Sequence, residues 1–197
     1  MTNPPSLNSK AELPRYSLFA GFLSYLVPGL GQITQGRVGK GVLFLVCLYA
    51  LFFYGMYLGD WKNVYLPEAP PGNRALNLPD IVMSIYNRPQ FAAQFWIGIA
   101  AWPAIWQYNH LPVPSRATSV FWHEFQKTPP ESPRDAPPGW EGKTLNELIT
   151  QGDKTWDLGW VYTVIAGVLN VLVIYDAAAG PAFGIGKADT PAGEDER

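Results

Sequence analysis

The feature that most constrains the fold is the run from Tyr16 to Gly59, in which two long apolar segments flank a short polar turn. The only charged residues of this run are Arg37 and Lys40, and both lie in the turn. Each segment is close to the roughly 20 residues that an α-helix needs to cross a ~30 Å hydrocarbon layer. The run therefore predicts a hairpin of two transmembrane helices.

Two more apolar stretches follow later in the 197-residue chain, separated by polar, proline-rich loops. We expect an all-α integral membrane protein with four spans, a glycine-rich N-terminal hairpin and a long proline-rich loop between helices 3 and 4. One membrane domain is expected at 16–182, between a polar tail at 1–15 and an acidic, disordered tail at 183–197. The expected spans are about 16–35, 41–59, 90–108 and 158–179. Lys10 and Arg15 precede the first apolar segment as in a signal peptide, but no small-residue cleavage site follows, so we expect an uncleaved helix.

Prolines and glycines interrupt the expected spans. Pro28 predicts either a kink or an early end of the first helix, with Gly29–Gly36 as a looser segment at the membrane edge. Pro103 predicts a kink rather than a break, because the apolar run continues past it. The closely spaced glycines around the first turn predict a tight approach of two helices.

The polar loops offer only short helices. These are expected at 78–86, 119–126 and 144–150, and Thr144 with Glu147 three residues later fits a capping box. We expect the long loop to lie over one face of the bundle, held there by four aromatic side chains: Phe121, Trp122, Phe125 and Trp140.

Polar groups at membrane depth are the strongest functional candidates, because each is costly unless it is paired. They are Gln94, Thr163, Asn170 and Asp176. Asn170 is expected to bond with Gln94 or with a carbonyl group freed by Pro28 or Pro103, and contact with a ligand or ion is the alternative. Asp176 is either a hydrated residue at the interface or a proton or cation site.

The fourth span carries one row of small and polar residues at helical spacing. The row consists of Gly159, Thr163, Gly167 and Asn170.

The turn between the first two spans holds the second group of candidates. Arg37 and Lys40 have no acidic residue near them in the sequence, so they are expected to set topology and contact anionic headgroups, or to recognise one lipid phosphate. Gln32 and Gln35 either cap helix ends or bind a ligand. The candidates for lipid or partner contact are Pro28, Gly29, Gly31, Gln32, Gly36, Arg37 and Lys40.

Several classes of function are disfavoured. The net charge of −2 gives no basic footprint for nucleic acid. His110, His123 and Glu124 match no established zinc spacing, and no metal or cofactor is expected. No catalytic residue is expected either, since nucleophile motifs and phosphate-binding loops are absent. The single Cys47 lies inside the second apolar segment and is interpreted as a packing residue.

The segment PGLGQITQGRVGKG at 28–41 resembles the hairpin of an uncharacterised bacterial family of four-helix membrane proteins, which is distantly similar to the two-transmembrane-helix domain family. The last span, from Trp156 to Ala182, looks like the closing segment of such a four-helix protein. The resemblance implies a multi-pass membrane protein, supplies no activity, and would place the Arg37–Lys40 turn in the cytoplasm.

These observations favour a non-enzymatic membrane component that packs against lipids or against partners, as a homo- or hetero-oligomer through its small-residue faces. One alternative is a small-solute or ion pathway lined by Gln32, Gln94, Asn170 and Asp176. A second is a membrane enzyme acting at the loop face with His110, His123, Glu124 or Asp157. The expected location is the bacterial cytoplasmic (inner) membrane. For four spans the Lys and Arg residues divide equally between the two sides, so charge does not set the orientation.

Overall fold

The protein is described here by a computed structural model that covers residues 17–66, 82–83, 86, 88–110, 121–122, 125–136, 142–150 and 154–180. These residues form helices and no strand. The elements are α1 (Leu18–Leu26), α2 (Leu30–Thr34), α3 (Val38–Leu58), α5 (Pro89–Phe95), the 3-10 helix η1 (Gly98–Ala101), α6 (Trp102–His110), α7 (Leu145–Thr150) and α8 (Lys154–Ala179). The tails expected at 1–15 and 183–197 lie outside this range, as does most of the helix expected at 78–86.

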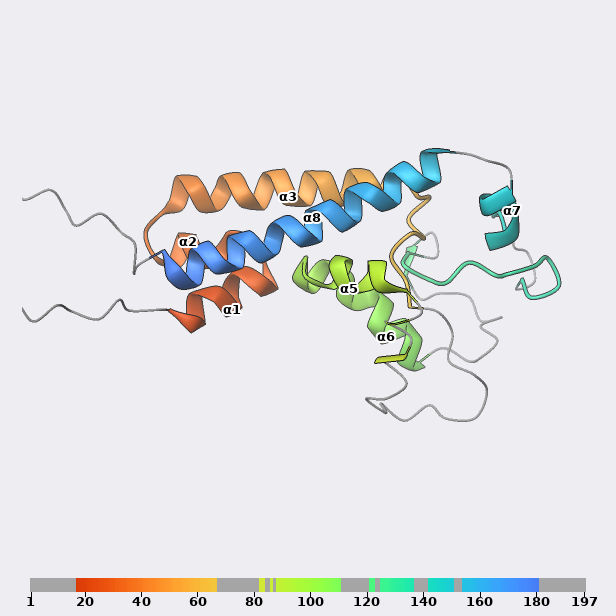
Figure 1. Ribbon diagram of the computed structural model, residues 1–197, viewed down its shortest axis with the longest axis horizontal. Helices are drawn as coiled ribbons and strands as arrows, with labels where there is room; N and C mark the ends of the chain where they lie inside the picture. Colours follow the sequence, from red (N-terminus) through yellow and green to blue (C-terminus); the bar gives the residue numbers. More distant parts are fainter. Residues whose placement is uncertain are drawn as a thin grey trace, which may run out of the picture.

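Helices α3 and α8 form a long antiparallel pair, and α8 also contacts α1, α2 and α5 (Figure 1). The pair packs closely because glycines face each other: a Cβ atom on Gly55 would come within 2.6 Å of the carbonyl oxygen of Gly159. Within the described residues, these are the two helices long and apolar enough to cross a membrane. Helix α8 begins four residues earlier than the expected Leu158.

The first expected span is a broken hairpin rather than one continuous helix. Helix α1 ends at Leu26, Gly29 adopts a left-handed backbone with φ of 83°, and α2 follows at once. The early end of the helix at Pro28, one of the two outcomes predicted, is therefore confirmed. Gly31 allows α2 to fold against α1, since a Cβ atom there would collide with the carbonyl oxygen of Ala20.

The course of this first hairpin follows from its contacts with α8. Helix α1 enters beside the end of α8, where the Ser17 amide donates to the carbonyl of Ala178 over 2.8 Å. It is about 14 Å long at 1.5 Å per residue, less than half of a ~30 Å layer. Helix α2 then returns, so that Gln35 again reaches α8 at Ala177. The α1–α2 hairpin is thus re-entrant: it enters and leaves at the same end of the α3–α8 pair.

The third expected span is broken as well. Helix α5 starts at the opposite end of the bundle, where Arg88 donates to the carbonyl oxygen of Asn63, and it ends near the middle of α8, where Trp96 contacts Asn170. There Gly98 has φ of 84°, and a Cβ atom on it would collide with the carbonyl oxygen of Tyr25. Helix α6 then leads back to Gln126, whose backbone amide donates to the carbonyl of Trp61. The predicted kink at Pro103 is wrong: the chain turns five residues earlier, and Pro103 lies in the first turn of α6.

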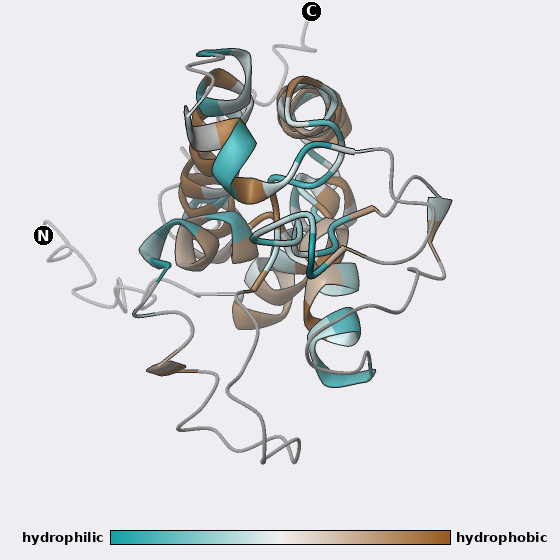
Figure 2. Ribbon diagram, turned by 90° about the vertical axis from the view of Figure 1, so that its right-hand side faces the viewer, coloured by the Kyte–Doolittle hydropathy of each residue, from teal (hydrophilic) through white to brown (hydrophobic). Residues whose placement is uncertain are grey.

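The described loop residues gather at this second end, where Figure 2 shows hydrophilic segments facing the viewer. The predicted capping box is confirmed, since the Thr144 amide donates to Glu147 Oε2 over 2.8 Å and α7 follows. The rings of Trp122 and Phe125 pack on Trp61, and Phe121 packs on Trp106, so three of the four predicted aromatic contacts hold the loop to the bundle. Trp140 lies outside the described residues.

Candidate functional site

The predicted small-and-polar row of α8 lies on its buried side. Gly159, Thr163, Gly167 and Asn170 are all buried. Gly167 allows the backbone of α5 to approach, since a Cβ atom there would collide with the carbonyl oxygen of Ala93. The row therefore holds the second hairpin, formed by α5, η1 and α6, against α8, and it does not face the surroundings.

At the second end of the row, Thr163 pairs with a fully buried amide. Gln94 Nε2 donates to Thr163 Oγ1 over 2.7 Å and to the carbonyl oxygen of Asn63 over 3.3 Å. Asn63 Nδ2 donates to the carbonyl oxygen of Gly55 over 2.9 Å. Arg88 closes this end by stacking its guanidinium 3.4 Å from the ring centre of Tyr65, and burial lowers the pKa of Arg88 to about 9.

Asn170, the last residue of the row and near the middle of α8, joins the two hairpins. Its Nδ2 donates to the carbonyl oxygen of Ser24 over 3.2 Å and to that of Trp96 over 2.8 Å. Ser24 lies four residues before Pro28, so its carbonyl is the one left without a helical donor by the proline. The predicted bond to a carbonyl freed by Pro28 is therefore confirmed, whereas Gln94 bonds to Thr163 instead of Asn170.

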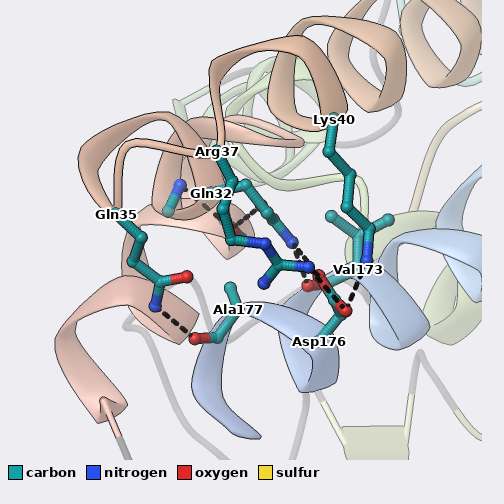
Figure 3. Close-up of polar contacts among 9 residues, drawn as sticks. Gln32, Gln35, Arg37, Lys40, Val173, Asp176 and Ala177 are labelled. Carbon is teal, nitrogen blue, oxygen red and sulfur yellow. Dashed lines mark hydrogen bonds and ion pairs between the residues drawn. The ribbon is translucent and has the colours of Figure 1, made fainter. Parts of the chain in front are cut away.

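Beyond the row, near the C-terminal end of α8, Asp176 is the centre of a polar cluster (Figure 3). Its carboxylate lies 3.0 Å from Arg37 Nη2 and 2.6 Å from Lys40 Nζ. Gln32 Nε2 donates to the same carboxylate over 3.1 Å and to the carbonyl oxygen of Val173 over 2.9 Å. The two cations of the turn thus do have an acidic partner, but it comes from the far end of the sequence.

The remaining turn residues divide into two groups. Pro28, Gly29 and Gly31 are packed inside, and Gly29 faces the backbone of Gly41. Gly36 and Gly39 are open, because a Cβ atom on either glycine would have nothing within 4 Å of it. Of the seven turn candidates, those able to contact anything outside the chain are therefore Gly36, Arg37 and Lys40.

Three fully buried amide oxygens have no hydrogen-bond partner within the described residues: Asn63 Oδ1, Gln94 Oε1 and Asn170 Oδ1. In each of these side chains the nitrogen donates and the oxygen stays unpaired. These three side chains thus place unpaired hydrogen-bond acceptors in the interior of the protein.

Sequence reasoning missed two residues of this network. Ser24 Oγ accepts from the Gly31 amide over 3.1 Å and donates to Gln32 Oε1 over 2.9 Å. Its position four residues before Pro28 was a usable signal. For Asn63 the sequence offered no signal, because this residue lies in a polar loop. The loop turns inward after Asp60 and Trp61, which both have a left-handed backbone.

Of the four candidates at the loop face, the structure describes His110 and Asp157. His110 stacks on Trp106 with ring centres 4.6 Å apart, and its Nδ1 lies 2.8 Å from the Trp106 carbonyl oxygen. His123 and Glu124 lie outside the described residues. Asp157 is exposed in the first turn of α8.

Comparison with known proteins gives a family but no function. The model of a family of unknown function, DUF6677, matches residues 19–189. No curated protein and no solved structure matches the chain.

Proposed function

The chain belongs to DUF6677, a family of unknown function, and for it we propose a multi-pass membrane protein that acts through contacts with lipids and partners rather than by catalysis. In this proposal α3 and α8 cross the membrane, and one re-entrant hairpin enters from each end of this helix pair. The membrane we expect is the bacterial cytoplasmic membrane.

The observation that carries the proposal is the direction of the apolar side chains. Only 28% of the apolar stretch of α3 and 33% of that of α8 are buried within the protein. Gly55 of α3 and the small-and-polar row of α8 face inward, while many large apolar side chains of both helices are exposed. Those exposed on α3 and α8 include Val42, Leu43, Val46, Phe53, Val161, Ile165, Val168 and Leu172.

This pattern suits lipid and is unfavourable in water. Soluble monomers rarely expose contiguous apolar patches larger than a few hundred Å². The small-residue faces expected to join subunits are already used within the chain, at Gly55 and Gly159 and at Gly167. Lipid contact therefore accounts for the exposed apolar faces better than a glycine-lined subunit interface does.

The test uses Cys47, the chain's single cysteine, which is exposed near the middle of α3. Maleimides react with a hydrated thiolate, so Cys47 is expected to stay unlabelled in intact membranes and to react after denaturation in detergent. Gly39→Cys in a Cys47→Ser background is the matched control, because Gly39 is open and lies at the end of α3. Labelling of Cys47 in intact membranes as fast as of the control would refute the proposal.

A second candidate function, the small-solute or ion pathway, is favoured by the three unpaired amide oxygens along α8. Together with Gln32 and Asp176 they follow the buried side of one helix rather than lipid-facing surfaces. Its test is solute flux in proteoliposomes, with Asn170→Leu as the variant expected to abolish it. Flux equal to that of empty liposomes would remove this candidate.

A further inference from the structure

Among the residues that the structure describes, the cluster around Asp176 has an excess of positive charge. Two cations, Arg37 and Lys40, share this one carboxylate, so one positive charge is left uncompensated within the cluster. Arg37 Nη1 is a buried atom with no acceptor within the described residues, so the exposed part of this side chain lies elsewhere on it. Both cationic side chains are partly open, with 34% and 41% of their surface exposed.

The same end also presents the start of α3. Helix α3 begins at Val38 with no side-chain cap and no acidic residue in its first turn. The first N–H groups of a helix have no partner inside it, and they carry the positive end of its dipole. The open backbone at Gly36 and Gly39 leaves room on both sides of this turn. An anion placed here meets side-chain cations and backbone donors together.

Apolar side chains border this charged end. Val38 and Val42 share a face of α3 and are 53% and 45% exposed. At the start of α1, Leu18 and Phe19 are exposed too. A ligand that fits both parts carries an anionic head and an apolar body.

We propose that Arg37, Lys40 and the first turn of α3 form a binding site for the phosphate headgroup of an anionic membrane lipid, with Val38 and Val42 beside its acyl chains. The inference rests on the proposed membrane location, which puts this end of α3 at headgroup depth. Asp176 positions the two cations from α8 and leaves their exposed sides to the lipid.

To test the site, the full chain is reconstituted into vesicles of phosphatidylcholine and phosphatidylglycerol in equal amounts. The protein is then extracted in mild detergent, and the lipid that stays bound to it is quantified. Wild type is expected to retain phosphatidylglycerol in excess over phosphatidylcholine. Lys40→Gln is expected to reduce that excess about fivefold, since a cation near an anionic surface contributes about 1 kcal/mol. Lys40→Arg is expected to preserve the excess, and Lys154→Gln, at the other end of α8, is the matched control.

Three outcomes would overturn the site. They are no excess of phosphatidylglycerol in wild type, an equal loss with Lys154→Gln, or inorganic phosphate alone raising the Tm of the lipid-free protein as much as phosphatidylglycerol does. The last result would assign the site to free phosphate. If Lys40→Gln fails to fold, Val38→Lys serves instead and is expected to raise the excess.

Cys47 labelling in the same vesicles separates the two proposals. Protected Cys47 without lipid preference refutes only the phosphate site. Labelled Cys47 refutes the membrane location and with it the site.

Discussion

Asn170 Nδ2, in the middle of α8, lies 2.8 Å from the carbonyl oxygen of Trp96, where the second hairpin turns. The same nitrogen reaches the carbonyl of Ser24 in the first hairpin. One side-chain amide thus satisfies both helix breaks. In the proposed membrane location, backbone breaks at this depth are tolerated only where protein or water covers them, and Asn170 would provide that cover.

Replacing Asn170 by Leu should destabilise the bundle. Leu keeps a similar volume but leaves two buried carbonyl groups without their donor, at a cost of about 1–3 kcal/mol each. The measurement is unfolding in detergent followed by circular dichroism. Leu172→Ala, at an exposed position two residues on, is the control and should change stability little. A Leu variant as stable as wild type would show that Asn170 does not hold the hairpins.

Gly98→Ala should be more harmful than an ordinary helix substitution. The residue has φ of 84°, and the added Cβ atom meets the backbone of Tyr25 and Leu26. Gly39→Ala is the matched comparison, since its Cβ position is open and alanine favours the helix by up to about 1 kcal/mol. We expect a lower Tm for the first variant and an equal or higher Tm for the second. Equal effects would contradict the close approach of the two hairpins.

Together with the proposed membrane location, the re-entrant course of α1 and α2 predicts that Leu18 and Gly39 lie on the same side of the membrane. A single cysteine at either position, in a Cys47→Ser background, should react with an impermeant maleimide from one side. A cysteine at Lys154 should react from the other side. If α1 and α2 crossed as one continuous helix, Leu18 and Gly39 would label from opposite sides.

The N-terminal cap of α7, formed by Thr144 and Glu147, should be lost at low pH. The Thr144 amide and hydroxyl, which bond to the carboxylate, hold the pKa of Glu147 below its ordinary value of 4.5. Because the folded pKa is the lower one, the stabilisation is complete above about 4.5 and is lost as pH falls through the folded pKa. Hydrogen exchange of 145–148 should therefore accelerate in that range. Glu147→Gln should remove the pH dependence, whereas Glu131→Gln, at an exposed loop position, should keep it.

The parts of the fold that local sequence determines were predictable. Helices α3 and α8 follow from uninterrupted apolar runs, and the α7 cap follows from Thr144 and Glu147. The early end of α1 follows from Pro28. In each case the cause lies within a few residues of its effect.

The rest depends on contacts between distant segments. Gly98 is one glycine in an apolar run, and only the facing carbonyl of Tyr25 explains why the chain turns there. Asp176 pairs with Arg37 across 139 residues, so no local sequence pattern predicts the pair. An apolar run of this length can form either two short helices or one long helix, and its composition does not distinguish them. Tertiary packing decides between the two outcomes.

The central place of α8 has a consequence for biosynthesis. Its partners α1, α2, α3 and α5 all precede it, so the ribosome completes them before the helix that joins them exists. Until Asn170 emerges, the carbonyls of Ser24 and Trp96 lack the donor seen in the finished protein. Assembly of this bundle therefore waits for the synthesis of α8, and a chain truncated before α8 should be recognised by quality-control proteases.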